Sequence, residues 1–179
     1  MSRKAIFLDR DGVLNKAVIR QGLPHPPSTV KDLEILPGVV ESLISLKNVG
    51  YFLSVITNQP DIARGIIDKQ VVNDINEVLK AQLAIDEIKV CSHDDVDSCF
   101  CRKPKPGLIL ESAKEHNISL ADSFFIGDRW RDIEAGKAAG CKTFFIDYGY
   151  LEKQPLNFDF KVKSLKEAAQ IILGEFYDN

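Results

Sequence analysis

The chain has 179 residues, of which 45% are hydrophobic, and this is enough for one ordinary domain with its own core. Its 23 basic and 26 acidic side chains give a formal charge of -3, without a long run of either sign. This balance gives no electrostatic support for binding nucleic acid or an anionic membrane, and we expect neither partner. The apolar stretch near the N-terminus is too short for a signal sequence, so we expect a cytoplasmic protein.

Short apolar runs alternate with helical patterns along the chain. The runs predict buried strands over residues 5–8, 52–56, 88–90, 124–126 and 143–146, and the patterns predict helices over 39–48, 69–83, 107–115, 132–139 and 165–173. This alternation predicts a single α/β domain over residues 1–179, a three-layer Rossmann-like sandwich with a mostly parallel sheet. Ligands of such folds bind beyond the carboxyl ends of the strands. No insertion is long enough for a large lid, and a proline-rich stretch over 22–28 predicts a surface loop.

Two carboxylates follow the first predicted strand. Asp9 and Asp11 stand two positions apart, just before Gly12, so an extended segment points both to the same side. Two like charges this close are unfavourable unless they share a cation or a proton, which favours metal binding or acid-base chemistry. Asp and Gly also form ordinary turns, and the pair alone does not decide between these interpretations.

Polar residues also follow two later strands. Thr57 and Asn58 come after the second strand, and Asp128 comes after the fourth, so a parallel sheet would bring all three to the edge that carries Asp9. Asp128 would suit Mg²⁺, whereas Thr57 and Asn58 could hold phosphate oxygens. Taken singly, Thr57 fits a turn or cap, and Asp128 and Asp132 fit a helix start with acids in its first turn.

Four possible zinc ligands follow the third predicted strand. Cys91, His93, Cys99 and Cys101 supply three thiolates and an imidazole within one short loop, which is a complete tetrahedral set. A site with four protein ligands leaves no coordination position open, so we expect a structural Zn²⁺ ion. Arg102 and Lys103 follow directly, and chelation would anchor the loop that presents these two cations. The fourth cysteine, Cys141, precedes a buried strand and is expected to be a core residue.

The ordered motifs together resemble the haloacid dehalogenase superfamily of phosphohydrolases across nearly the whole chain. They are DRDG after the first strand, Thr57 after the second, Lys103 before a helix, and GDRWRD after a later strand. The resemblance implies that Asp9 is the nucleophile and that Asp11 is the general acid and base. It also implies that Asp9, the backbone carbonyl of Asp11 and the side chain of Asp128 bind Mg²⁺. Thr57 and Lys103 would then hold the phosphate, and the acid at position 11 indicates a phosphatase.

The zinc loop, with FLDRDGVLN and TNQPDIARG, resembles a narrower branch of this superfamily. This branch lacks a large cap domain and contains the heptose bisphosphate phosphatases of surface polysaccharide synthesis and the histidinol phosphatases. The resemblance implies a phosphosugar substrate, with Arg64 and Arg102 near its second phosphate or hydroxyl groups. Because no large cap is present to mediate association, we expect a monomer.

Which substrate of this branch the chain takes stays open. The segment 62–65 (IARG) favours the heptose enzyme. Pro60 and Asp61 replace the usual Ser-Gly, however, and the loop over 20–29 lacks the expected Gly-Tyr-Val. Histidinol phosphate, or another small phosphorylated metabolite, is therefore the alternative substrate. A module that binds phosphosugars without catalysis is an alternative of another class, against which the intact Asp9, Asp11, Lys103 and Asp128 argue. His25 and His116 are expected outside the site, and the sequence leaves a substrate contact for Trp130 open.

Overall fold

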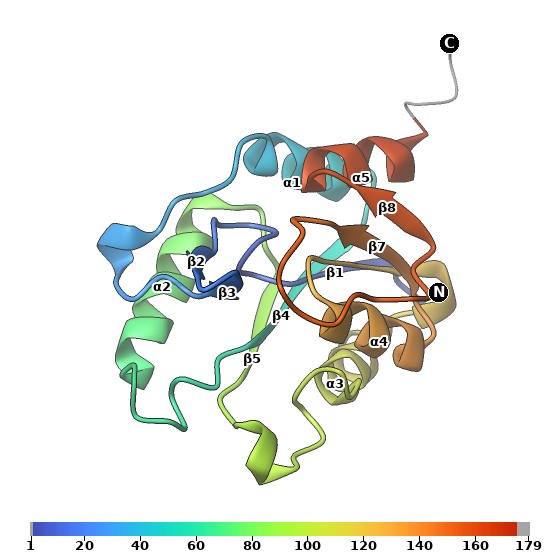
Figure 1. Cartoon of the computed structure of the whole chain (residues 1–179). Coiled ribbons are helices and arrows are strands. Elements are labelled where there is room, and N and C mark those ends of the chain that lie inside the picture. Colours follow the sequence, from blue (N-terminus) through green and yellow to red (C-terminus); the bar gives the residue numbers. More distant parts are fainter. Residues whose placement is uncertain (1, 175–179) are drawn as a thin grey trace.

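A parallel β-sheet organises the protein (Figure 1). The structure is a computed structural model that describes residues 2–174. The strand order in the sheet is β5-β4-β1-β6-β7-β8, and every neighbouring pair is parallel. The strands are β1 (Ala5–Leu8), β4 (Phe52–Asn58), β5 (Glu87–Cys91), β6 (Phe124–Gly127), β7 (Lys142–Ile146) and β8 (Phe160–Val162).

Helices cover both faces of this sheet and complete three layers (Figure 1). Side chains of α1, α2 and α5 pack with Ile6 and Leu8 of β1, whereas those of α3 and α4 pack with Ala5 and Phe7. The alternation within β1 explains its uninterrupted apolar sequence, because a strand buried on both faces needs apolar residues at every position. The helices are α1 (Val39–Asn48), α2 (Lys69–Gln82), α3 (Gly107–His116), α4 (Trp130–Ala139) and α5 (Leu165–Leu173), with short 3-10 turns η1 (Val30–Asp32), η2 (Asp95–Asp97) and η3 (Leu120–Asp122).

The strand order places the functional loops at one edge of the sheet. The chain runs from β1 outward to β4 and β5, then crosses to the other side of β1 to build β6, β7 and β8. The order therefore reverses around β1, and the carboxyl ends of β1, β4 and β6 lie side by side. Open parallel sheets bind ligands in the crevice at such a reversal. The predicted fold class is confirmed, including the mostly parallel sheet.

The first loop contains a hairpin that the sequence analysis did not predict. Strands β2 (Val18–Arg20) and β3 (Leu23–His25) pair antiparallel and are joined by Gln21 and Gly22, with φ of 52° and 77°. Positive φ at both central residues defines a turn whose twist matches that of paired strands. The prediction of a surface loop over 22–28 therefore missed strand β3 within it. Pro24 lacks an N–H group to donate, and it is tolerated because both strands of this two-stranded sheet are edge strands.

The last strand, β8, was also missed, since it has three residues and a lysine at its centre. Within residues 2–174, no helix is both long enough and apolar enough to cross a membrane.

Candidate active site

Asp9 and Lys103 form the buried centre of the site. Asp9 follows β1, and Lys103 lies in the loop between β5 and α3; their side chains are 9% and 2% exposed. Lys103 Nζ lies 2.6 Å from Asp9 Oδ1, and it also donates to the carbonyl oxygen of Ile56 in β4 at 2.7 Å. The ammonium group is thus fixed between the ends of two neighbouring strands, beside the residue expected to be the nucleophile.

Asp132, to which the sequence analysis gave no role in the site, is the second partner of Lys103. Its Oδ1 lies 2.7 Å from Lys103 Nζ, and its Oδ2 accepts a hydrogen bond from the Arg129 main-chain nitrogen at 3.0 Å. The second contact caps the first turn of α4. Asp132 therefore begins a helix, as its sequence context indicates, and also contacts the buried lysine. A capping pattern cannot reveal the second contact, because Lys103 comes from a distant loop.

Asp128 completes a cluster of three buried carboxylates. Oxygens of Asp9, Asp128 and Asp132 lie within 4.8 Å of one another. Burial and the charge of Asp132 raise the pKa of Asp9 to about 7, although Lys103 opposes this shift. Burial and the charges of Asp9 and Asp132 raise the pKa of Asp128 well above its ordinary value. Burial disfavours the charged form of Lys103, but the negative charges of Asp132 and Asp9 have the larger effect and raise the pKa of Lys103. The ammonium group of Lys103 therefore contacts two carboxylates of the cluster, those of Asp9 and Asp132.

This cluster fits a hard divalent cation. Asp128 Oδ1 is buried and has no hydrogen-bond partner, which is costly for a carboxylate oxygen unless a cation or proton is bound to it. Mg²⁺ prefers oxygen ligands, and this cluster offers several carboxylate oxygens close together. A positive charge there would also offset the mutual repulsion that raises the carboxyl pKa values. The residues present therefore suit Mg²⁺.

Asp11 is held at the wall of the same pocket by three side chains. Its carboxylate accepts hydrogen bonds from Arg10 Nη2 at 3.0 Å, Gln59 Nε2 at 2.8 Å and Asn15 Nδ2 at 3.0 Å. Arg10 is fully buried and also donates to Asn76 in α2 at 2.9 Å, so the clamp is anchored in the interior. These donors fix the orientation of Asp11, and the sequence motif alone did not reveal them.

Thr57 and Asn58 both lie at the end of β4, but they face different partners. Thr57 is buried and its hydroxyl accepts a hydrogen bond from Gln59 Nε2 at 2.9 Å. Asn58 lines the pocket, and its amide pairs with the main chain of Lys103, donating at 3.0 Å and accepting at 3.1 Å. Asn58 therefore anchors the loop that carries the lysine.

Arginines from separate loops line the pocket above these carboxylates. The pocket has a volume of about 270 Å³, and the β2–β3 hairpin contributes to its wall with His25. Arg64 pairs with Asp94 through two contacts of 2.7 and 2.8 Å, and Arg102 and Arg131 both pair with Asp95. Arg131 and His25 were not expected at the site.

The acidic partners of these arginines are ionised at neutral pH. The hydrogen bond from Arg64 holds the pKa of Asp94 at about 2, and Arg102 lowers the pKa of Asp95. An anionic group entering the pocket would therefore have to compete with Asp94 and Asp95 for the guanidinium groups.

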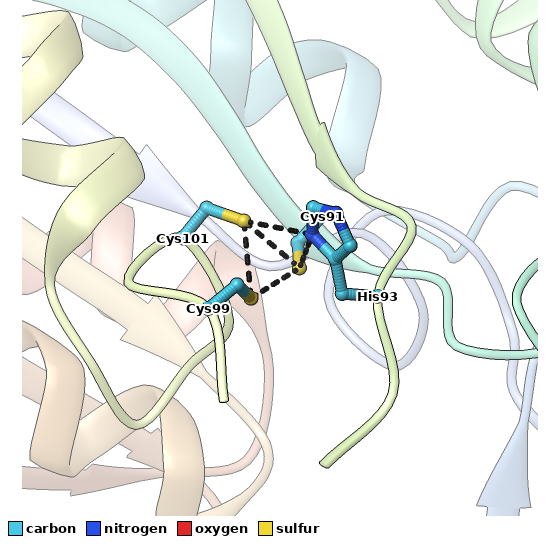
Figure 2. A group of neighbouring side chains, drawn as sticks. All are labelled: Cys91, His93, Cys99 and Cys101. Carbon is cyan, nitrogen blue, oxygen red and sulfur yellow. Dashed lines mark hydrogen bonds between the residues drawn. The ribbon is translucent and has the colours of Figure 1, made fainter. Parts of the chain in front are cut away.

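The four predicted zinc ligands converge in the loop beside the pocket (Figure 2). Cys101 Sγ lies 3.3 Å from both Cys91 Sγ and Cys99 Sγ, and His93 Nδ1 lies 3.3 Å from Cys101 Sγ. The Sγ atoms of Cys91 and Cys99 lie 3.7 Å apart, and Cys91 Sγ lies 3.8 Å from His93 Nδ1. Thiolates about 2.3 Å from a tetrahedral Zn²⁺ ion stand about 3.8 Å apart. The Cys91–Cys99 separation agrees with this value, and the two contacts of Cys101 Sγ are about 0.5 Å shorter. The donor set therefore suits zinc.

Three other residues that the sequence singled out lie elsewhere. Cys141 is buried among apolar side chains of the α3 and α4 face, where burial raises the pKa of its thiol to about 12. His116 ends α3, stacks on Phe52 and contacts Glu87 at 3.1 Å. The ring of Trp130 covers the start of α4, with the ammonium of Lys153 and the guanidinium of Arg131 over it at 4.3 and 4.6 Å.

Comparison with known proteins identifies the family. Residues 15–146 match the family model of the haloacid dehalogenase-like hydrolases. The D-glycero-beta-D-manno-heptose-1,7-bisphosphate 7-phosphatase of Helicobacter pylori strain J99 is 39% identical over 175 residues, which cover 93% of this chain and 95% of that protein. The enzyme of the same name from Photorhabdus laumondii is 39% identical over 186 residues, covering 97% and 92%.

A solved structure agrees with these sequence relationships. The crystal structure of the D,D-heptose 1,7-bisphosphate phosphatase from B. bronchiseptica, complexed with magnesium and phosphate, has a TM-score of 0.78 and 28% identity. The match covers 96% of this chain and 99% of that chain. The chain therefore belongs to the haloacid dehalogenase-like hydrolases, and it is a phosphatase. The family resemblance drawn from the sequence is confirmed.

Proposed function

We propose that this phosphatase removes the 7-phosphate of D-glycero-β-D-manno-heptose 1,7-bisphosphate through a phosphoryl group carried by Asp9. The observation that carries the mechanism is the buried contact of Lys103 with Asp9 and Asp132, beside the unpartnered oxygen of Asp128. The relatives named for this reaction match the chain over more than nine tenths of its length. The buried contacts support the proposed chemistry, and the relatives support the proposed substrate.

Each residue at the centre has a distinct role in this proposal. Asp9 attacks phosphorus, and Asp11 donates a proton to the leaving oxygen and later takes one from the attacking water. Lys103 and Thr57 hold phosphate oxygens, and Asn58 assists at the pocket wall. Asp132 orients the ammonium of Lys103, and the Arg10, Asn15 and Gln59 clamp orients Asp11. A covalent intermediate divides one difficult displacement into two easier steps.

Asp9, the main-chain carbonyl of Asp11 and Asp128 would hold Mg²⁺ in this proposal. When bound, Mg²⁺ supplies positive charge that offsets the charge of the transferring phosphoryl group. The side chain of Lys103 adds a second, fixed positive charge.

The arginine-lined rim suits a substrate with a second anionic group. Arg64 and Arg102 come from the two loops that flank the pocket, and a guanidinium group binds phosphate oxygens through two parallel hydrogen bonds. A bisphosphate can displace Asp94 and Asp95 from these arginines while its other phosphate reaches Asp9. A monophosphate lacks this second group, so we expect it to bind more weakly.

The substrate assignment is tested by measuring phosphate release with Mg²⁺ from a matched panel. It contains both anomers of the heptose 1,7-bisphosphate, histidinol phosphate, other sugar phosphates and nucleotides. We expect kcat/KM to be highest for the β anomer, with release from position 7 alone. A preference for histidinol phosphate would instead point to Asp61, whose carboxylate lines the pocket and could receive an amine.

The Asp9→Asn variant tests the nucleophile in the same assay. It removes the attacking oxygen with little change of shape, and we expect at least a thousandfold loss of kcat, on the order of other nucleophile deletions. Asp74→Asn, the same change at an exposed position of α2, is the matched control. Full activity of Asp9→Asn would exclude Asp9 as nucleophile.

We further propose that the Cys91, His93, Cys99 and Cys101 cluster holds a structural Zn²⁺ ion. The ion would hold the ends of the 92–98 segment together and so restrain the loop that leads into Arg102 and Lys103. Arg102 Nη1 already donates to the carbonyl oxygen of His93 at 3.3 Å, which ties the pocket rim to a zinc ligand.

A further inference from the structure

We propose that Tyr150 is a positioning residue for Asp128, fixing which carboxylate oxygen is available to the divalent cation. This inference rests on the proposed function, because it concerns the cation site of that reaction. It assigns a role to a segment beyond β7 that no motif in the sequence singled out.

Tyr150 and Gly12 constrain the same oxygen of Asp128. The Tyr150 hydroxyl donates to Asp128 Oδ2 at 2.8 Å. A Cβ atom added to Gly12 would lie 1.9 Å from this oxygen, so residue 12 has to be glycine for Asp128 to lie there. The other oxygen, Oδ1, is buried without a hydrogen-bond partner. The protein therefore satisfies Oδ2 and leaves Oδ1 free to bind a cation as a single-oxygen ligand.

The segment that carries Tyr150 is itself anchored at several points. The Tyr148 hydroxyl donates to the Gly12 carbonyl at 3.0 Å, and the Leu151 main-chain nitrogen donates to the Gly22 carbonyl in the β2–β3 turn at 2.9 Å. Arg129, the residue after Asp128, donates to Glu152 at 2.9 Å. The rings of Tyr148 and Tyr150 stack with centroids 5.5 Å apart. These contacts fix the phenol, so its hydroxyl is already in place when the cation binds.

The chemistry of the contact explains why a phenol suits this position. A hydroxyl donor keeps the carboxylate from rotating and compensates for the loss of water around Oδ2. Phenylalanine would keep the ring and its packing but leave both oxygens of Asp128 buried without a donor. Groups that orient metal ligands in this way typically contribute about 10–100-fold in metal affinity.

The experiment is a calorimetric titration of Mg²⁺ alone into substrate-free protein, for the wild type and Tyr150→Phe. We expect the dissociation constant of Tyr150→Phe to rise at least about tenfold. With p-nitrophenyl phosphate as a generic substrate, its half-saturating Mg²⁺ concentration should rise in parallel, whereas kcat at saturating Mg²⁺ stays within about threefold. Tyr51→Phe, at the amino end of β4 and away from the site, is the matched control and should bind Mg²⁺ as the wild type does.

Tyr148→Phe separates the hydroxyl of Tyr150 from the segment as a whole. An equal loss of Mg²⁺ affinity in Tyr148→Phe and Tyr150→Phe would overturn the assignment, because the anchored segment would then be responsible. Unchanged Mg²⁺ affinity in Tyr150→Phe, or a fall in kcat alone, would also overturn it. Absence of Mg²⁺ binding by the wild type would overturn the proposed function itself and this inference with it.

Discussion

At the residue scale, Lys103 contributes both to the stability of the site and to its proposed chemistry. Its ammonium group donates to Asp9, Asp132 and the Ile56 carbonyl while its side chain is 2% exposed. A buried lysine is costly unless it is paired, and here two carboxylates and a carbonyl oxygen compensate for the lost water. The same charge would attract a phosphate group to Asp9.

We expect Lys103→Gln to lower both stability and activity. The variant leaves Asp9, Asp128 and Asp132 buried without their cation, and removal of one partner from a buried ion pair typically costs about 3 kcal/mol or more. Urea unfolding in the absence of Mg²⁺ measures this loss, and saturating Mg²⁺ should restore part of it. We expect kcat to fall at least about a hundredfold. Lys114→Gln, at an exposed position of α3, is the control; equal stability of the two variants would contradict this view of Lys103.

The sequence indicated the acidic residues of the centre but not their partners. Asp9, Asp11 and Asp128 could be placed because each lies within three residues of the end of a predicted strand, and parallel strands end at one edge. Asp132 could not be paired with Lys103, because a helix-capping pattern carries no information about a distant loop. Tyr150 was missed for the same reason, since it lies 22 residues from Asp128 and in no regular element.

At the element scale, the loop that carries the four proposed zinc ligands would depend on a bound ion for part of its order. It runs from the end of β5 to the start of α3 and contains one 3-10 turn, η2, as its regular structure. Cys91 is buried, but Cys99 and Cys101 are partly exposed. Val96 and Phe100 in this loop are exposed, so few apolar contacts order residues 92–100. A shared ion would add to the restraint that the ion pairs of Asp94 and Asp95 provide.

We expect Cys99→Ser to lose zinc and to loosen residues 92–106. Elemental analysis of the purified protein should find about one zinc per chain in the wild type and much less in the variant. Amide hydrogen exchange should become faster in this segment, whereas Mg²⁺ binding at Asp9 and Asp128 persists. Cys141→Ser, a change outside the cluster, should keep the ion. A wild-type protein without zinc would refute the structural zinc site.

Most of the other elements followed from local pattern, but two were predicted too short and two were missed. Helix α4 begins at Trp130 and not at 132, and β4 continues to Asn58, two residues beyond the predicted strand. The predicted helices over 39–48 and 165–173 match α1 and α5 at both ends, because glycine or serine lies close to each end of a clear apolar periodicity. The β2–β3 hairpin was missed because its turn has Gln21 where asparagine or aspartate is usual before glycine. Three-residue strands such as β8 are too short to show a period.

At the scale of the whole molecule, the topology assembles one site from both halves of the sequence. Asp9 and Asp11 come from the first strand, Lys103 from the middle of the chain, and Asp128 and Tyr150 from the last third. The reversal of strand order around β1 makes this meeting possible without a second domain to close the pocket. We propose that substrate choice depends on the hairpin and on the loops that carry Arg64 and Arg102, because these line the pocket. A monomeric state and a single domain over all 179 residues stay predictions.

The central claim is that Asp9 carries the phosphoryl group during turnover. Asp11→Asn lacks both the acid for the leaving oxygen and the base for the attacking water. With p-nitrophenyl phosphate, whose phenolate leaves without being protonated, the variant should form this intermediate but hydrolyse it slowly. Mixing the variant with Mg²⁺ and p-nitrophenyl phosphate, then reducing it with borohydride, converts an aspartyl phosphate to homoserine. Mass spectrometry of the peptide that contains residues 5–16 should locate homoserine at position 9. Unmodified Asp9 in protein that has released p-nitrophenolate, or modification at another aspartate, would contradict the account.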